Sequence, residues 1–553
     1  MLFLILVILF NLYFASGQVV HIKQGTLVGF RNVSRQGKEY VGFLGILYAK
    51  PPVNELRFQD PQPHPGWSGE RDATKMNNVC PQVTMLMPNA TFGHEDCLYL
   101  NVYTPEADVG AKLPVMFLIH GGGFRMGAAN FYNEKFFMDQ NVVLVSINYR
   151  LGVLGFLSFA DEVIPGNFGM KDQVFALQWV RENIAQFGGD PNSVTIFGCS
   201  AGGASVDYHI ISPLSKGLFQ NAIVQSGTAS CPWAMTPSTI ARQRAEAVAT
   251  LVNCPAEPTS EALACMRDKT AEAITLTDAK FQEWVSSPLV NFPPVVDSYL
   301  GQDAFLPDHP LKLSPNNVNA IIGLTMREGN LVAIPMCKNE FQLAKELEAD
   351  LANRLPILMC IQDHVDYKDR KKISEDLMNF YLKGEKIDEH TVGENFQELG
   401  TDLLFTHGSY KSALHYYKRI PVYFYLFDIA IPEPNAFTHY LGNCSSAKGP
   451  GHGEENYFMF NDLFSAFLGS TPPLTKEDDG LSKEILQLWT TFAAKGVPDE
   501  IWTPVVSDKI EYLYMTREGF SMRSGLFESR LKFVNSLPLD VNKYKLDRER
   551  NEL

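Results

Sequence analysis

The stretch Val194-Thr195-Ile196-Phe197-Gly198-Cys199-Ser200-Ala201-Gly202-Gly203 decides the fold of this chain. It opens as a short β-branched and aromatic run, which is the composition of a buried strand. It then turns into Gly-x-Ser-x-Gly, followed by small residues that can start a helix. A serine on such a sharp turn is lifted out of the sheet, and the flanking glycines let neighbouring backbone approach closely. We therefore predict that Ser200 is a nucleophile, provided that a base, an acid and oxyanion donors lie elsewhere.

Length and composition are those of an ordinary globular protein. The 553 residues are 45% hydrophobic and 20% charged, which is ample material for a large buried core. The formal net charge is −15 at pH 7. Nucleic acids and anionic membranes are bound through excess lysine and arginine, so this acidic balance argues against both kinds of partner.

Both ends of the chain carry candidate sorting signals. Met1 to Gly17 is an apolar run that ends in small residues and is shorter than the roughly 20 residues of a membrane span. We predict a cleaved signal peptide at residues 1–17 and entry into the secretory pathway. The last four residues, Arg550-Asn551-Glu552-Leu553, resemble the Lys-Asp-Glu-Leu retrieval signal, so ER lumen and secretion both stay open. Candidate glycan sites are Asn32, Asn89 and Asn443.

The chain has nine cysteines, and disulfides persist in secreted proteins. The pairs with close partners are Cys80 with Cys97 and Cys254 with Cys265. The odd total leaves at least one free thiol. Pairing stays open for the other five cysteines: Cys199, Cys231, Cys337, Cys360 and Cys444. No spacing of cysteines and histidines resembles a zinc site.

Buried strands alternate with helical patterns along most of the chain. Short, almost wholly apolar runs are typical of parallel strands covered on both faces. They occupy Leu113–Ile119, Val142–Asn148, Val194–Phe197, Ala222–Val224, Ala320–Gly323 and Val422–Phe427. Asp172 to Phe187 has helical spacing, and Phe341 to Leu382 indicates amphipathic helices interrupted by Pro356. We predict one α/β domain over residues 18–553, with a large, mostly parallel central sheet, flanking helices and helical insertions over the site.

Two segments near the N-terminus are interpreted differently. Val19 to Phe30 alternates in polarity and carries Gly25 and Gly29, which predicts a small hairpin. Gly42 to Pro52 is followed by a proline-rich stretch, and we interpret it as extended surface chain.

The segment His120-Gly121-Gly122-Gly123-Phe124 follows the buried strand Leu113–Ile119 directly. Three consecutive glycines cost conformational entropy, so they indicate backbone that lies close to something. We interpret the N–H groups of Gly122 and Gly123, with that of Ala201 after the candidate nucleophile, as donors to a developing oxyanion. A plain tight turn is the alternative.

A histidine and an acid in a suitable order complete the candidate site. His452 lies in the flexible loop Gly449-Pro450-Gly451-His452-Gly453, and Glu328 lies in a loop after the strand that ends at Gly323. The order Ser200, Glu328, His452 is that of α/β-hydrolases. We interpret the competing side chains as structural: His209, His415 and Asp297.

From about Gly25 to Phe533 the chain resembles the type-B carboxylesterases of the carboxylesterase/cholinesterase family, and most of all a general invertebrate-type carboxylesterase. Besides the serine turn and the triple glycine, the resemblance is carried by Gly45–Pro52, Glu95–Asn101, Asn148–Gly152, Phe187–Pro191 and Gln225–Gly227. It implies an α/β-hydrolase fold and ester hydrolysis through an acyl-enzyme on Ser200, with Glu328 and His452 completing the triad.

The resemblance also implies supporting roles. Cys80–Cys97 and Cys254–Cys265 match family disulfides, and Ser226 resembles a buried hydroxyl that supports the triad. Two ion pairs match structural pairs of the family, Arg57 with Glu95 and Arg150 with Asp172. We expect a monomer or weak homodimer that acts on a small-molecule ester and needs no cofactor or metal.

Three departures from the family pattern argue against choline esters. Cholinesterases hold quaternary ammonium on a tryptophan between the first two disulfide cysteines. Here that interval has no tryptophan and offers Met85, Leu86, Met87 and Phe92. The segment Pro288–Phe292, which resembles the acyl-pocket wall, keeps one aromatic, and Cys199 replaces an acid or amide before the nucleophile. We predict hydrolysis of neutral esters. The alternatives are an inactive adhesion protein of the same family, or a lipase.

Overall fold

The computed structural model describes residues 17–83, 89–431, 444–460 and 474–539. Several predicted features lie outside these residues, namely the signal peptide up to Ser16, the methionine-rich residues 85–87, the sequon residue Asn443 and the tail Arg550–Leu553. Of the other two sequon residues, Asn89 is exposed and Asn32 is partly exposed.

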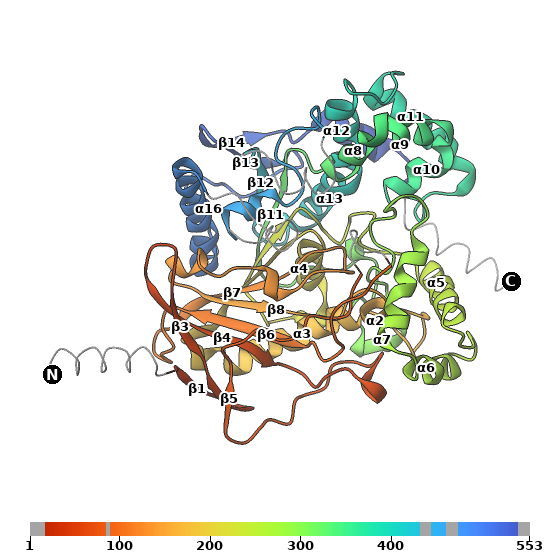
Figure 1. Ribbon diagram of the computed structural model, residues 1–553. Coiled ribbons are helices and arrows are strands. Elements are labelled where there is room, and N and C mark those ends of the chain that lie inside the picture. Colours follow the sequence, from red (N-terminus) through yellow and green to blue (C-terminus); the bar gives the residue numbers. More distant parts are fainter. Residues whose placement is uncertain (1–16, 84–88, 432–443, 461–473, 540–553) are drawn as a thin grey trace.

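An eleven-stranded mixed sheet runs through the centre of the molecule (Figure 1). From β8 to β13 the neighbouring strands pair in parallel, and the strands at both edges pair antiparallel. The order is β14 (Gly519–Ser524), β13 (Glu511–Thr516), β12 (Val422–Phe427), β11 (Asn319–Thr325), β10 (Asn221–Gln225), β9 (Gly189–Cys199), β7 (Leu113–Ile119), β8 (Val143–Ile147), β6 (Tyr99–Thr104), β4 (Glu39–Leu47) and β3 (Phe30–Val33). The six apolar runs predicted as strands all lie in this sheet, which confirms the predicted fold class.

The N-terminal hairpin is also confirmed, because β1 (Val19–Ile22) and β2 (Gly25–Val28) pair antiparallel. They form a separate small sheet with β5 (Glu70–Asp72). The prediction that Gly42 to Pro52 is surface chain was wrong in its first half, since β4 is buried from its second residue onward. The strand was not predicted because its glycines interrupt the apolar pattern. A Cβ on Gly42 would lie 2.4 Å from the ring of Phe30, and Gly45 has a positive φ where the pairing with β6 shifts register.

Helices cover both faces of the sheet, and β7 shows how the core divides. Its residues Val115, Phe117 and Ile119 belong to one hydrophobic core, whereas Met116 and Leu118 belong to the other, as the two-residue period of a strand requires. The first core includes residues of α3 (Phe168–Asn183), α4 (Ala201–Ile211) and α13 (His407–Tyr416). The second includes residues of α16 (Lys476–Lys495). Buried strands are thus covered on each side, as a parallel sheet needs.

Helix α16 illustrates how local sequence sets an element. Thr475 accepts the N–H of Asp478, whose carboxylate accepts the N–H of Thr475 in return, which is a capping box. Gly496 ends the helix with a φ of 71°. The buried face repeats at helical spacing and consists of Leu481, Ile485, Leu488, Trp489 and Phe492.

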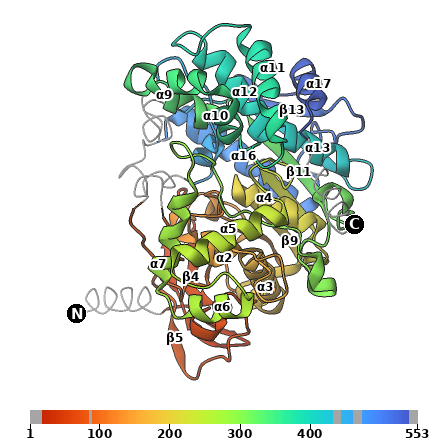
Figure 2. The same ribbon diagram turned by 90° about the vertical axis from the view of Figure 1, so that its right-hand side faces the viewer.

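A group of helices lies to the right of β12 and β13 in Figure 1. It contains α8 (Asn330–Met336), α9 (Lys338–Ala349), α10 (Leu351–Leu358), α11 (Arg370–Leu382) and α12 (Gln397–Thr401). The helices predicted over Phe341 to Leu382 are therefore present, and Pro356 lies inside α10 just before its end. Figure 2 shows α5, α6 and α7 on the side that faces right in Figure 1. Bounds of the other helices are α2 (Gly152–Phe156), α5 (Ser238–Leu251), α6 (Thr259–Arg267), α7 (Ala271–Thr275) and α17 (Glu528–Ser536).

Three disulfides cross-link the chain. The predicted pairs Cys80–Cys97 and Cys254–Cys265 both form. Cys337 and Cys444, whose pairing the sequence left open, form a third bridge across 107 residues. Within the described residues Cys199, Cys231 and Cys360 are free and buried, which agrees with the expected free thiol. Three bridges are consistent with an oxidising compartment such as the secretory pathway.

Both ion pairs implied by the resemblance are present and bidentate. Arg57 contacts the two carboxylate oxygens of Glu95 at 2.6 Å each. Arg150 contacts those of Asp172 at 2.8 and 2.6 Å, with both side chains almost fully buried. Bidentate guanidinium–carboxylate contacts orient both groups, so these pairs hold loops in place around the sheet.

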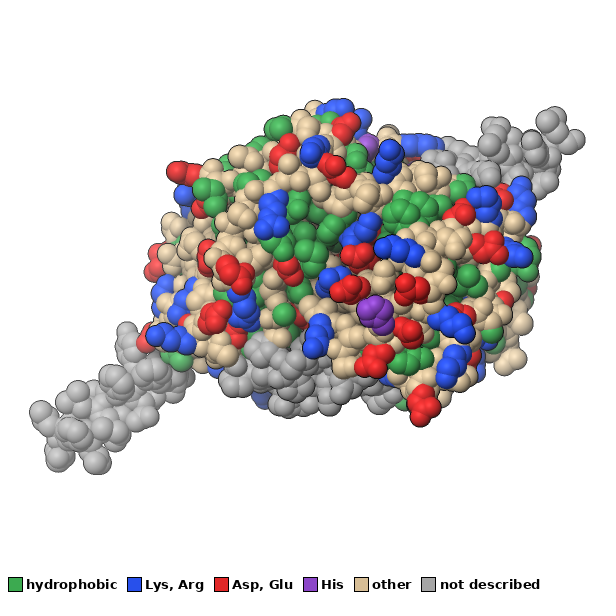
Figure 3. Space-filling model, turned by 90° about the horizontal axis from the view of Figure 1, so that it is seen from above, with side chains coloured by type: hydrophobic (Ala, Val, Ile, Leu, Met, Phe, Trp, Pro, Cys, Tyr) green, Lys and Arg blue, Asp and Glu red, His purple; other side chains and the backbone are tan. Residues whose placement is uncertain are grey.

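Acidic and basic side chains are interspersed over the face seen in Figure 3. On the exposed side of α11, for example, Lys371 pairs with Glu375 and Lys372 pairs with Asp376. This side of α11 is therefore a solvated face with paired charges. In the described ranges, no helix is both long and apolar enough to cross a membrane.

Candidate active site

Ser200 lies on the turn between the end of β9 and the start of α4. Its backbone angles are φ 63° and ψ −125°, a combination that residues other than glycine seldom adopt. The flanking glycines are required because the carbonyl oxygen of Ile119 lies so close. A Cβ on Gly198 would come within 2.3 Å of that oxygen, and one on Gly202 within 2.2 Å. The Gly-x-Ser-x-Gly pattern therefore allows β7 to pack against a strained serine turn.

In the loop after β7, a hydrogen bond from His120 fixes the direction of the N–H group of Gly122. Nδ1 of His120 lies 2.8 Å from the carbonyl oxygen of Gly121, and since a carbonyl only accepts, Nδ1 carries the proton. Burial lowers the pKa of His120 from 6.5 to about 4, so the imidazole is neutral near pH 7. In a trans peptide C=O and N–H point in opposite directions, so the bond to His120 orients the N–H of Gly122.

The next peptide is oriented in the same way. The carbonyl of Gly122 accepts the N–H groups of Arg125 at 3.2 Å and Met126 at 3.0 Å, which turns the N–H of Gly123 the other way. This turn needs glycine, because Gly122 has a φ of 107° and a Cβ there would lie 2.0 Å from the oxygen of Met126. Among the residues the structure describes, none accepts a hydrogen bond from the N–H of Gly122 or Gly123. Two oriented donors are thus free for a ligand.

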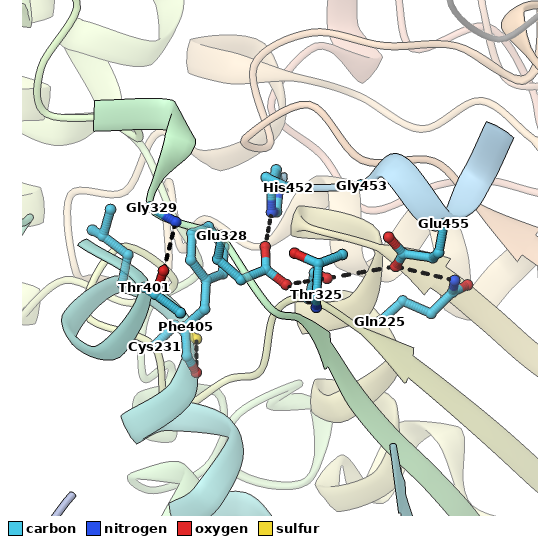
Figure 4. Close-up of polar contacts among 12 residues, drawn as sticks. Gln225, Cys231, Thr325, Glu328, Gly329, Thr401, Phe405, His452, Gly453 and Glu455 are labelled. Carbon is cyan, nitrogen blue, oxygen red and sulfur yellow. Dashed lines mark hydrogen bonds and ion pairs between the residues drawn. The ribbon is translucent and has the colours of Figure 1, made fainter. Parts of the chain in front are cut away.

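Glu328 lies just beyond the end of β11 and is fully buried. Its Oε1 accepts the N–H of Thr325 at 2.7 Å and the hydroxyl of Ser226 at 2.6 Å. Its Oε2 lies 2.6 Å from Nδ1 of His452 (Figure 4). Donors fixed to β11 and to the end of β10 therefore set the direction in which this carboxylate faces the imidazole.

His452 lies in the glycine-rich loop that the sequence indicated, and this loop runs beside the Glu328 loop. The N–H of Arg327 donates to the carbonyl of Pro450 at 3.0 Å. The imidazole packs on the ring of Phe405, with the ring centres 4.5 Å apart. The next residue, Gly453, borders the serine turn, since a Cβ there would lie 3.5 Å from Sγ of Cys199. The predicted base, acid and nucleophile are therefore neighbours in space.

The competing side chains have structural roles, as expected. Asp297 accepts the N–H groups of Phe305 and Leu306 and the amide of Asn167. His209 bonds to Ser215 and Gln173, and His415 bonds to the carbonyl of Leu313. In the described part of the chain, no group of three or more His, Cys, Asp or Glu side chains is placed to hold a metal ion.

A second buried carboxyl group, that of Glu455, was not predicted from the sequence. Its Oε1 lies 3.4 Å from the amide nitrogen of Gln225 and 3.5 Å from the hydroxyl of Ser226, and Figure 4 shows it beside the Glu328 group. Burial, with the charge of Glu328 acting in the same direction, raises the pKa of Glu455 from 4.5 to about 8. The sequence shows that Glu455 lies three residues after His452, but it does not show that this side chain is buried.

Cys199 is buried between these acids and the serine. Burial raises the pKa of its thiol well above 9.0, and the nearby Glu455 and Glu328 act in the same direction. The thiol is therefore neutral near pH 7, and since the thiolate is the reactive form, Cys199 behaves as a small apolar filler.

Comparison with known proteins places the chain in a family. The model of the carboxylesterase family matches residues 16–534. The chain belongs to the carboxylesterase family. Esterase FE4 of Myzus persicae is 36% identical over 519 residues, which cover 90% of this chain and 88% of that protein. Venom carboxylesterase-6 of Apis mellifera is 34% identical over 536 residues, covering 94% of each. Juvenile hormone esterase of Tribolium castaneum is 33% identical over 506 residues, covering 88% and 85%.

Family and relatives together make this carboxylesterase a serine-type hydrolase of carboxylic esters with an α/β-hydrolase fold. The resemblance seen in the sequence is confirmed. The alternative of an inactive adhesion protein is not supported, because these relatives are named as esterases.

The raised pKa of Glu455 predicts a pH-dependent effect on stability. In the unfolded chain this carboxyl ionises near 4.5, whereas in the folded carboxylesterase it stays protonated up to about 8. Folding therefore takes up a proton between these values, and the contribution of Glu455 to stability falls as the pH rises through them. We expect the Tm of Glu455→Gln minus that of the wild type to increase from pH 4.5 to about 8, measured by calorimetry at several pH values.

Asp207 offers a matched control for this prediction. It is fully buried, and burial raises its pKa from 3.8 to about 6. The Tm difference for Asp207→Asn should increase only up to about pH 6 and then stay level. A Glu455→Gln difference that is constant across the whole range would contradict the assignment.

Proposed function

We propose that this carboxylesterase hydrolyses neutral carboxylic esters through an acyl-enzyme on Ser200, with His452 as general base and Glu328 as the orienting acid. One observation carries the proposal: the imidazole of His452 lies 2.6 Å from the Glu328 carboxylate beside the strained serine turn. A carboxylate only accepts, so Nδ1 donates to it, and Nε2, the other ring nitrogen, serves as the general base.

In the first step the hydroxyl oxygen of Ser200 attacks the ester carbonyl. His452 takes the hydroxyl proton at Nε2, and Glu328 stabilises the imidazolium that forms. The proton then passes from His452 to the alkoxide oxygen, and the alcohol leaves. The strained serine backbone supports this role, because it presents the side chain away from the sheet.

The negative charge that develops on the carbonyl oxygen is stabilised by backbone donors. We assign these to the N–H groups of Gly122, Gly123 and Ala201. The first two are oriented by fixed carbonyls and have no acceptor among the described residues. A donor that is oriented before the reaction needs no reorganisation when the charge appears, which makes such groups effective.

Water completes the cycle. It attacks the acyl carbon while His452 accepts its proton, the same amides hold the second oxyanion, and the carboxylic acid leaves as Ser200 is reprotonated. His452, Glu328 and the amides thus serve both half-reactions.

Neutral substrates are favoured by the groups that surround the serine. The residue before it, Cys199, is an uncharged thiol. On the acyl side, a Cβ on Gly123 would lie 3.4 Å from the oxygen of Leu289 and 3.6 Å from a methyl of Val290, so an aliphatic wall borders the oxyanion glycine. This wall suits an apolar acyl group. The ammonium of a choline ester lies in the alcohol group, and next to Ser200 it would lose hydration and meet the uncharged Cys199 thiol instead of a charged partner.

A matched pair of esters tests this preference. Butyrylcholine should be hydrolysed with a lower kcat/KM than its neutral isostere, in which carbon replaces the quaternary nitrogen. Loss of a cation–π contact of about 2 kcal/mol corresponds to a roughly thirtyfold decrease in kcat/KM. Equal or faster hydrolysis of the choline ester would refute the preference, and a jump in activity at a lipid–water interface would favour a lipase.

A further inference from the structure

Arg125 lies two residues after the proposed oxyanion glycine Gly123, and its side chain is buried. Its Nη2 donates to Oδ1 of Asp278 at 2.5 Å, with side-chain exposures of 4% for the arginine and 2% for the aspartate. Asp278 lies in the short segment Leu276–Phe281, far from the loop in sequence. The ion pair therefore joins the oxyanion loop to a separate part of the chain.

Asn291 extends this connection to the acyl-pocket wall. Its amide nitrogen donates to the backbone oxygen of Asp278 at 3.0 Å and to Oδ1 of the same residue at 3.1 Å. Asn291 belongs to the wall segment Pro288–Phe292. Gly123 packs between the wall and Arg125. A Cβ on Gly123 would meet Leu289 and Val290 of the wall on one side and would lie 3.7 Å from Cγ of Arg125 on the other. The loop, the ion pair and the wall thus meet at one glycine.

This cluster is not built for stability alone. Four of its buried polar atoms have no hydrogen-bond partner among the described residues: Nε and Nη1 of Arg125, Oδ2 of Asp278 and Oδ1 of Asn291. A buried ion pair with unsatisfied groups is often no more stable than apolar side chains of similar volume. Apolar side chains could fill the same space as Arg125 and Asp278, so stability alone does not explain why this position carries an ion pair.

We propose that Arg125 is a positioning residue that holds the oxyanion donors at a set distance from the acyl-pocket wall, through its ion pair with Asp278 and the link to Asn291. The inference rests on the proposed oxyanion role of Gly122 and Gly123. Arg125 is coupled directly to these donors, because its backbone N–H donates to the Gly122 carbonyl, which orients the N–H of Gly123. A shift of Arg125 therefore turns that peptide.

The double variant Arg125→Met/Asp278→Leu tests this role, because it removes both charges together and leaves neither buried alone. Misplaced donors should lower kcat about 10- to 100-fold and leave KM within about threefold, since the effect falls on the transition state. Arg125→Lys keeps the charge opposite Asp278 and should recover most of the activity. If the double variant does not fold, Asn291→Leu, which removes only the link between Asp278 and the wall, serves as the test.

An alkyl trifluoromethyl ketone and the matching methyl ketone separate positioning from general damage. The fluorinated ketone is attacked by the Ser200 oxygen, its carbonyl electron pair becomes the oxyanion, and the serine proton passes to His452. Its Ki should rise in the double variant by the factor that kcat/KM falls, while the Ki of the methyl ketone, which reports apolar binding, stays within about threefold. An unchanged ratio of the two Ki values would overturn the inference.

Arg150→Met/Asp172→Leu is the matched control, because that pair is equally buried but its arginine head contacts α3 and the carbonyl of Gln59. It should lower Tm without changing the ratio of Ki values. A wild-type enzyme that binds both ketones equally would instead contradict the proposed acyl-enzyme mechanism, so the two failures are distinguishable.

Discussion

Ser200→Ala should lower kcat for p-nitrophenyl butyrate by about 10⁶-fold, because loss of the nucleophile of a serine triad removes nearly all covalent catalysis. The substitution removes one hydroxyl on the turn between β9 and α4 and leaves the fold intact. Active-site titration gives the sharper measurement. A dialkyl p-nitrophenyl phosphate should release one p-nitrophenolate per wild-type chain and none from the variant, and mass spectrometry should find the phosphoryl group on Ser200.

Ser193→Ala is the matched control for this experiment. Ser193 lies on the same strand, β9, and its hydroxyl contacts the carbonyl of Ala493 rather than the candidate site. It should keep both kcat and the full titration burst. A burst that persists in Ser200→Ala, or a phosphoryl group found on another residue, would remove Ser200 from its proposed role.

Glu328→Gln should lower kcat about 10⁴-fold with little change in KM, for a reason that the structure makes specific. Thr325 and Ser226 both donate to Oε1, so the amide oxygen of the glutamine must occupy that position. Its NH₂ group then faces Nδ1 of His452, which has to accept rather than donate. The imidazole proton therefore moves to Nε2, and a protonated Nε2 cannot take the proton of Ser200.

The competing acid provides the control for this variant. Asp297→Asn retains the shape of a buried carboxyl that binds backbone amides of its own loop, and it should leave kcat within about threefold of the wild type. Steady-state kinetics on p-nitrophenyl butyrate measure both variants. A Glu328→Gln enzyme with more than about a tenth of wild-type kcat would assign the orienting acid elsewhere.

Much of the fold follows from patterns within a few residues. The strands β7, β8 and β10 were predicted because parallel strands are buried on both faces and therefore read as continuous apolar runs. Strand β4 was missed because Gly42 and Gly45 interrupt its pattern. Those glycines are explained only by the ring of Phe30 and by the shifted pairing with β6, which no local window contains.

The candidate site divides in the same way. The serine turn was predictable, because an apolar strand, Gly-x-Ser-x-Gly and small helix-starting residues follow one another directly. The close approach of Ile119, which requires Gly198 and Gly202, was not. The loops of Glu328 and His452 could be singled out by their position after strands and by their glycines. That Glu328 and His452 make contact across 124 residues is a property of the packed sheet.

By itself the sequence determined the parallel sheet, the serine turn and the triple glycine, since each is marked by a pattern of residues that are neighbours in the chain. Only the tertiary structure decided the Cys337–Cys444 bridge, the burial of Glu455 and the ion pair of Arg125 with Asp278. These features join segments more than a hundred residues apart or depend on how completely water is excluded. Both are set by the packing of distant elements, which no local pattern encodes.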